Sequence, residues 1–391
     1  MRPIIIASRC LMGGSHMKSA DFIKNWHTTV QTNFPRIAES IDYNKFLKVG
    51  HDLGVRNRYF FEPYPFTSFD MSLEQRNKWM LEEQKNLISG DLVEWCKNNN
   101  IPVKDIGAVM TMYNEPEPLP GLEWPIYKLL KLPPTVQRYA FRNYWCGGGS
   151  MLFSRAYDYL IQHPNKAVLL YTALNGSYYP WSMYQKFKSI SKRRHLNNDT
   201  DGMNTSSVFN AYMNAIFGND SCGYAVIIGS KLARKWGIIH GNNKIYLEMK
   251  RYIEHNIPEP ENGASLSIGE NGSYLQLPTQ VISEHVGTAF RDMYSKLLGR
   301  TKLSDIPYKF IHPGGKMVID AISKHCNIDS GELSRSEECL KHGNNTSVTV
   351  FWMLDQWFKE KHPDPNKLWT MGGQGLGSTF VTVLGKTCYI G

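Results

Sequence analysis

The stretch Tyr308–Gly315 reads YKFIHPGG and places a histidine between a short apolar run and a Pro-Gly-Gly turn. The run Tyr308–Ile311 has the length and composition of a buried strand. Further along, the segment Gly343–Ser347 reads GNNTS and precedes a second apolar run. His312 and Asn344 thus stand where a strand or loop meets a helix N-terminus, a position that collects donors and anions.

The matching feature upstream is Trp145–Ser150, which reads WCGGGS. A strand is predicted over Val136–Asn143 and a helix over Met151–Gln162, so Cys146 falls in a glycine-rich turn between them. This strand-turn-helix pattern exposes one side chain at the start of the helix. We therefore interpret the rest of the chain as a scaffold for Cys146, His312 and Asn344.

The length of 391 residues suggests two domains or two fused halves, and the alternation of strand and helix patterns predicts an α/β protein. Each half shows an apolar strand, a glycine turn, a buried helix and another apolar strand. We expect a half at 1–229 that carries the cysteine and a half at 230–391 that carries the histidine and asparagine. One long helix is expected over Leu73–Asn98, and Tyr178–Asn204 is expected to be the least regular part.

The composition argues against several classes of protein. The seven cysteines are scattered without CxxC spacing, which argues against a disulfide framework and a zinc site, and no metal is predicted. No apolar segment approaches the roughly 18 residues of a membrane span. No signal peptide is recognisable, so a cytoplasmic protein without a membrane span is expected.

The formal net charge of +9 has its densest cluster at Lys186–Arg194. This cluster is either a solvated surface or a contact for a phosphate-rich ligand such as coenzyme A. A nucleic-acid binder is the remaining option, but the chain has no nucleic-acid motif, so no nucleic-acid partner is expected.

The three residue types suggest acyl-transfer chemistry. A thiol becomes nucleophilic as a thiolate, and a helix N-terminus or a nearby imidazolium can lower its pKa. An imidazole and a carboxamide can together stabilise the oxygen of a thioester enolate. Each residue also has a structural interpretation: Cys146 as a turn residue, His312 as a turn cap and Asn344 as an ordinary helix N-cap.

The chain resembles the type III polyketide synthases, the chalcone- and stilbene-synthase-like branch of the thiolase superfamily. The His-Pro-Gly-Gly motif and the Gly-Asn pair before an apolar helix both match that family. Further matching segments are Pro120-Gly121, Leu132–Arg138, Ile216-Phe217-Gly218 and Gly373–Gly377.

The resemblance implies a five-layer αβαβα fold, a homodimer, and acyl-CoA and malonyl-CoA as substrates, with no tightly bound cofactor. Cys146 would hold the acyl group, and His312 with Asn344 would support decarboxylation. The remaining roles that it implies are a gatekeeper (Phe217), a residue that reaches into the partner's cavity (Leu119), cavity positions (Asn175 and Tyr178), a close approach to the pantetheine arm (Gly314 and Gly315) and contacts to coenzyme A phosphates (Lys45 and Lys48).

The sequence also departs from the family pattern. The turn after Cys146 is one residue shorter, the acid common at Ala173 is missing, and the segment from Lys186 to Asn204 has no counterpart. The hypothesis is a decarboxylative Claisen condensing enzyme with a pyrone, resorcinol or chalcone-type product. Its rivals are a ketoacyl synthase III-like enzyme of fatty-acid synthesis and a catalytically degenerate thiolase-fold binding protein.

Overall fold

The structure is a computed structural model. It describes residues 2–62, 69–113, 121–142, 144–197, 209, 212–213, 215–216, 218–240, 244–256, 265–269, 272–276, 279–362, 364–375 and 379–390.

The described residues form a nine-stranded sheet in the order β11-β12-β13-β8-β1-β7-β6-β4-β5. Its strands are β1 (Ile4–Met12), β4 (Ile106–Tyr113), β5 (Gln137–Phe141), β6 (Ala167–Asn175), β7 (Asp220–Ile228), β8 (Ile245–Asn256), β11 (Tyr308–Ile311), β12 (Leu368–Gln374) and β13 (Thr379–Tyr389). The two parts of the sheet meet at β1 and β8, which pair only at Ile4–Glu248 and Ile5–Leu247.

The two parts repeat one topology. In the first part, β4 runs parallel to β6, β6 antiparallel to β7, and β7 antiparallel to β1. In the second part, β11 runs parallel to β12, β12 antiparallel to β13, and β13 antiparallel to β8. Edge strand β5 has no counterpart among the described residues. The repeated order agrees with two duplicated halves, whereas their boundary at 229/230 stays a prediction.

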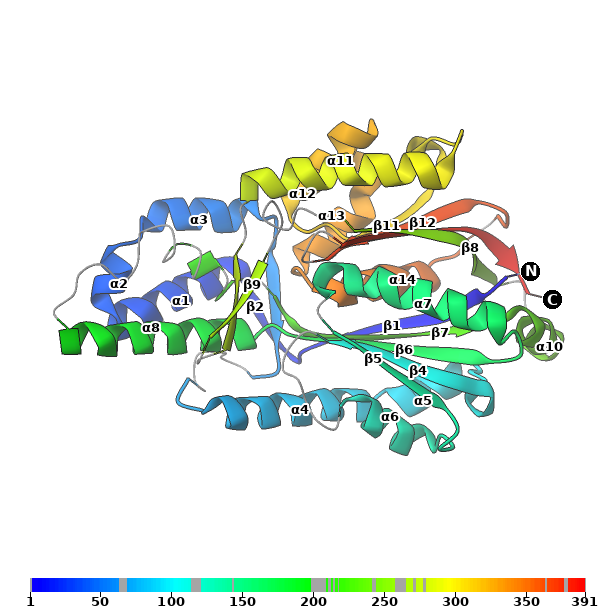
Figure 1. Ribbon diagram of the computed structural model, residues 1–391, viewed down its shortest axis with the longest axis horizontal. Coiled ribbons are helices and arrows are strands. Elements are labelled where there is room, and N and C mark those ends of the chain that lie inside the picture. The colour runs from blue at the N-terminus through cyan, green and yellow to red at the C-terminus, as the bar shows by residue number, and fades with distance from the viewer. Residues whose placement is uncertain are drawn as a thin grey trace.

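Helices make the other three layers (Figure 1). The central layer holds α7 (Gly148–Gln162) and α14 (Thr349–Lys359), which lie between the two parts of the sheet. One outer layer holds α4 (Leu73–Ser89), α5 (Leu92–Asn98) and α6 (Glu123–Leu130). The other outer layer holds α11 (Thr279–Leu298) and α12 (Lys316–Cys326). The five-layer α/β fold predicted from the sequence is confirmed.

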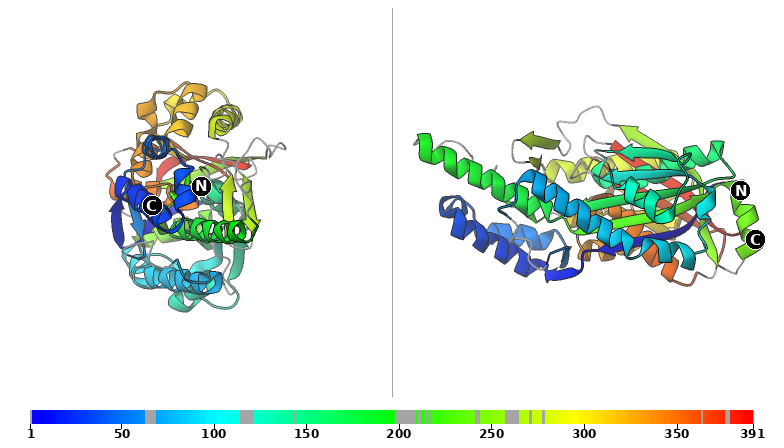
Figure 2. Two further views of the ribbon diagram at one scale, coloured as in Figure 1. Left: turned by 90° about the vertical axis from the view of Figure 1, so that its left-hand side faces the viewer. Right: turned by 90° about the horizontal axis from the view of Figure 1, so that it is seen from below.

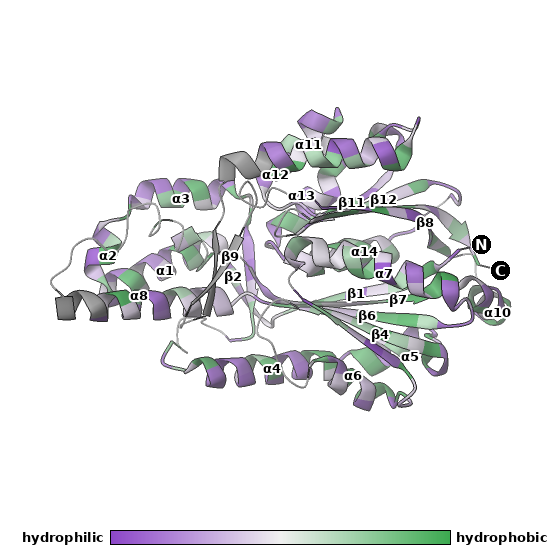
Figure 3. Cartoon of the chain, viewed as in Figure 1, coloured by the Kyte–Doolittle hydropathy of each residue, from purple (hydrophilic) through white to green (hydrophobic). Residues whose placement is uncertain are grey.

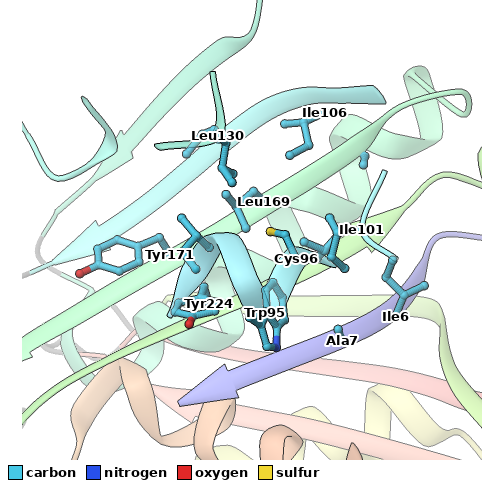
Figure 4. Close-up of a cluster of buried hydrophobic side chains, with 14 of the residues drawn as sticks. Ile6, Ala7, Trp95, Cys96, Ile101, Ile106, Leu130, Leu169, Tyr171 and Tyr224 are labelled. Carbon is cyan, nitrogen blue, oxygen red and sulfur yellow. The ribbon is translucent and has the colours of Figure 1, made fainter. Parts of the chain in front are cut away.

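Hydrophobic packing explains this layering. Along β6, Val168 and Leu170 face the core that contains the central helices, whereas Leu169, Tyr171 and Ala173 face the core beneath α5. Figure 4 shows this second core, where Trp95 and Cys96 of α5 contact the strands. Because successive strand residues point to opposite faces, a continuous apolar strand can bury both its sides.

A separate lobe consists of α1 (Ser19–Asn33), α2 (Pro35–Glu39), α3 (Tyr43–Asp52) and α8 (Tyr178–Asn197) (Figures 1 and 2). Aromatic contacts hold it together: the Trp26 and Phe187 rings are 6.2 Å apart, and the Phe34 and Tyr184 rings 4.9 Å apart. The prediction that Tyr178–Asn204 is irregular was therefore wrong as far as Asn197. Basic residues interrupt the apolar face of α8 and hide its helical period.

The predicted helix Leu73–Asn98 is also corrected, because α4 ends at Ser89 and α5 begins at Leu92. The break lets Asp91 pair with Arg9, with Oδ1 and Nη2 2.7 Å apart. Figure 3 shows hydrophilic and hydrophobic residues alternating along α4, as expected for a helix that covers a sheet. Within the described ranges, no helix has the length and apolar character needed to cross a membrane.

Candidate active site

Cys146 lies in a 3₁₀ turn, η2 (Trp145–Gly147), between β5 and the start of α7. The turn is strained, because Trp145 has a φ of +44° in the left-handed region. A side chain at Gly147 would approach the Gly375 nitrogen to 2.8 Å, and one at Gly149 would approach the Ser347 carbonyl oxygen to 2.3 Å. The glycines of the predicted turn are thus required by close backbone approach, and Cys146 itself stays partly exposed.

His312 follows the last residue of β11. Its backbone N–H donates to the Gly372 carbonyl oxygen at 2.8 Å, which extends the pairing of β11 with β12. The side chain is buried, and neither ring nitrogen has a hydrogen-bond partner in the described part of the chain. A buried imidazole without partners is costly, so its nitrogens are available to a bound molecule.

Asn344 is held at both ends of its carboxamide. Nδ2 donates to the Gly314 carbonyl oxygen at 2.8 Å, and Oδ1 accepts from the Thr346 backbone N–H at 2.9 Å. These two bonds fix which end carries the nitrogen. Since an amide nitrogen has two N–H groups, the bond to Gly314 leaves a second donor on Asn344.

The backbone brings the three residues into one region. The Cβ position of Gly373 lies 2.9 Å from the Cys146 carbonyl oxygen, and the preceding Gly372 accepts from His312. The turn η6 (Thr346–Val348), which follows Asn344, contacts η2. Segments far apart in the sequence therefore meet at the N-terminal ends of α7 and α14.

The two turns are related by the duplication. Thr346 has a φ of +43° and opens a 3₁₀ turn before α14, just as Trp145 opens one before α7. Ser347, rather than Asn344, therefore occupies the place equivalent to Cys146. The Ser347 hydroxyl is 2.6 Å from the Thr172 hydroxyl of β6. Sequence reasoning missed this pair, because a Thr in an apolar strand gives no separate signal.

Burial of the Cys146 thiol and the His312 ring disfavours their charged forms, although the Cys146 residue as a whole is only half-buried. It raises the pKa of Cys146 to about 12 and lowers the pKa of His312 to about 3. The effect of a helix end and an imidazolium on the pKa of the thiol stays a prediction, because burial is the largest cause of the shift at Cys146 here.

The remaining residues are those for which the resemblance implies a binding role, and they are taken here by their place in the fold. Gly314, with a φ of +64°, and Gly315 form the turn after His312. The Leu53 side chain, just beyond α3, lies 3.9 Å from the Cβ position of Gly315, so α3 ends against this turn. Lys45 and Lys48 are exposed on α3, and the Lys45 Nζ lies 5.4 Å from the Phe209 ring centroid.

The two residues predicted to line the cavity, Tyr178 and Asn175, differ in their surroundings. Tyr178 is buried at the start of α8, next to Tyr179, whose ring is 6.2 Å from that of Trp145. Asn175 accepts a hydrogen bond from Gln84 of α4 at 2.9 Å, so its side chain is held on the face away from α7. Phe217 and Leu119 lie outside the described residues.

Comparisons with known proteins give similar sequences and a similar structure. The family of chalcone and stilbene synthases, C-terminal domain, matches residues 248–387. Type III polyketide synthase B of Arabidopsis thaliana is 25% identical over 304 residues, which cover 74% of this chain and 69% of that protein. The 1,3,6,8-tetrahydroxynaphthalene synthase of Streptomyces coelicolor is 21% identical over 342 residues, which cover 87% and 82%. The chain is therefore similar to type III polyketide synthases over most of its length, and its C-terminal part matches the chalcone and stilbene synthase family.

The crystal structure of that Streptomyces coelicolor synthase, a bacterial type III polyketide synthase, has the same thiolase-like fold. It matches with a TM-score of 0.77 over 99% of both chains, at 16% identity. At this identity the likeness shows that the two chains share a fold.

Proposed function

We propose that this protein is a decarboxylative Claisen condensing enzyme. Cys146 attacks the thioester of an acyl-CoA starter and keeps the acyl group while coenzyme A leaves. Malonyl-CoA then loses carbon dioxide, and the resulting enolate attacks the acyl carbon and releases the Cys146 sulfur. Repeated extension gives a polyketide of the pyrone, resorcinol or chalcone type.

The observation that carries the proposal is the pair of free donors at the meeting point of the halves. The ring of His312 has no described partner, and Asn344 has one N–H beyond its bond to Gly314. Donors that are fixed before reaction stabilise developing negative charge on an oxygen without reorganisation. Because loss of carbon dioxide generates the carbanion, the reaction needs no additional base.

The neutral state of Cys146 has a consequence for this chemistry. With a pKa near 12, few molecules carry a thiolate at neutral pH. The proposal therefore requires a proton to leave the thiol as the acyl-CoA binds, with neutral His312 as the acceptor within the site.

We also propose that Lys45 and Lys48 contact coenzyme A phosphates, because α3 ends against Gly315 and both lysines face solvent. Gly314 and Gly315 would leave room for the pantetheine arm, and Tyr178 would shape the cavity. Phe217 as gatekeeper, Leu119 as a residue that crosses a homodimer, and a cytoplasmic location stay predictions. Asn175 is retained with less support, since Gln84 holds its side chain.

A second candidate is a thiolase-fold protein that binds acyl-CoA without turnover, and the raised pKa of Cys146 favours it. Malonyl-CoA decarboxylation separates the two candidates. The condensing enzyme should release carbon dioxide from malonyl-CoA and form product with a starter, whereas the binding protein should do neither. Consumption of malonyl groups only from acyl carrier protein would instead indicate a fatty-acid type enzyme.

A further inference from the structure

Asn219, just before β7, is a buried residue that the chemistry above does not use. Its Oδ1 accepts from the Tyr59 backbone N–H at 3.2 Å. Its Nδ2 donates to the Asn345 Oδ1 at 3.0 Å and to the His342 carbonyl oxygen. Its own carbonyl oxygen accepts from the Gly176 backbone N–H at 3.0 Å. The carboxamide thus joins β3 (Asn57–Phe60) to the loop 342–345, and the backbone carbonyl adds a bond to Gly176.

Two of the three side-chain bonds of Asn219 go to the loop 342–345, which carries Asn344. Asn345 is fully buried, and its Nδ2 lies 3.4 Å from the Gly343 carbonyl oxygen. Gly343 has a φ of +102°, and a Cβ there would lie 2.2 Å from the Asn219 Nδ2. The Asn219 side chain therefore occupies the space beside Gly343 and bonds to the residues on both sides of it.

The remaining side-chain bond reaches a strand that follows the lobe helix α3 in the chain. Tyr59 belongs to β3 (Asn57–Phe60), which closely follows α3 and its lysines Lys45 and Lys48. One bond from Asn219 to this strand and two bonds to the loop connect β3 with the segment that carries Asn344. Buried hydrogen bonds of this kind hold a unique geometry, because any unmade partner is costly.

We propose that Asn219 is a positioning residue for Asn344. It holds the loop 342–345 so that the Asn344 carboxamide stays on the Gly314 carbonyl and keeps its second N–H toward the reacting thioester. This inference rests on the proposed decarboxylation.

The test compares Asn219→Ala and Asn219→Asp with the wild type. Alanine removes all three side-chain bonds. Aspartate keeps an acceptor for the Tyr59 N–H but turns an oxygen toward the acceptors of Asn345 and His342. Both variants should lower kcat for malonyl-CoA decarboxylation by about tenfold or more, with KM within about twofold. Acylation of Cys146 by acyl-CoA should persist, since the Cys146 turn is built on other contacts.

The matched control is Thr387→Val, near the C-terminal end of β13. Thr387 is also buried, accepts from the Lys367 N–H at 2.8 Å and donates to the Asp364 carbonyl at 3.2 Å. This variant should lose stability without a change in decarboxylation. If Asn219→Ala lowers acylation and decarboxylation in equal proportion, Asn219 is a general structural residue and the inference is wrong.

Hydrogen exchange provides a readout that does not need activity. In Asn219→Ala, backbone amides of 342–348 should exchange about tenfold faster than in the wild type or Thr387→Val. Unchanged exchange in this segment would overturn the inference. If the wild type shows no decarboxylation, the proposed function fails, and exchange alone then decides whether Asn219 holds the loop.

Discussion

Acidification should destabilise the protein through His312. Burial lowers the pKa of His312 to about 3, whereas an unfolded histidine titrates near pH 6.5. The folded pKa lies below the unfolded one, so the stabilising contribution is complete above about pH 6.5 and is lost as pH falls toward 3. Since one pKa unit corresponds to about 1.4 kcal/mol, the loss at pH 4.5 should be about 3 kcal/mol.

The assay is urea unfolding of wild type and His312→Gln between pH 7.5 and pH 4.5. Glutamine keeps a polar side chain but does not titrate, so the difference between the two proteins isolates His312. Other groups cancel in this difference, including Asp220, whose pKa burial raises to about 6 and whose effect has the opposite sign. The free energy of unfolding should fall by about 3 kcal/mol more in the wild type by pH 4.5.

A constant difference between the proteins would refute the reasoning, because it would mean that His312 titrates alike in the folded and unfolded states. A wild type that gains stability relative to the variant on acidification would also contradict it. That result would show a folded pKa above 6.5 and would restore an imidazolium paired with the Cys146 thiolate.

Three further predictions test the site, two of them with a control variant. Asn344→Ala should lower malonyl-CoA decarboxylation by about 10²-fold, the scale of one lost oxyanion donor; retention of full decarboxylation would remove Asn344 from the chemistry. Gly149→Ala should destabilise the protein by about 1–3 kcal/mol in urea unfolding, because the new methyl meets the Ser347 carbonyl oxygen. Gly331→Ala, where a Cβ meets nothing within 4 Å, should be neutral, and equal effects would contradict the packing argument. Thr172→Val should cost about 1–3 kcal/mol by leaving the buried Ser347 hydroxyl unpaired, with Thr172→Ser restoring stability; an unaffected valine variant would show that this bond contributes little.

Sequence motifs and the spacing of apolar residues were sufficient to predict those parts of the structure that depend on residues close together in the chain. The turn at Cys146 and the strand before His312 follow from the glycines and from the apolar runs beside them. The strand order could not be predicted, because pairing such as β1 with β8 depends on contacts between distant segments. The helical period of α8 was hidden by its basic residues, and its aromatic partners on α1 and α2 are distant in sequence.

The candidate site likewise has features that the sequence could predict and features that it could not. The residue types at Cys146, His312 and Asn344 were visible because each stands in an unusual turn. Their protonation states were not, since burial rather than sequence proximity sets the pKa of Cys146 and His312. Asn219 and Thr172 were missed because a single polar residue in or beside an apolar strand looks the same in the sequence whether it faces solvent or a buried loop.

Mass spectrometry of the intact protein after incubation with acyl-CoA starters tests the central claim most directly. The starters should include short, aromatic and fatty acyl groups, and proteolytic mapping should follow. We predict a mass increase of one acyl group, located on Cys146, absent in Cys146→Ala and lost when malonyl-CoA is added. An unmodified Cys146 with every starter, or an acyl group on another cysteine, would contradict the account.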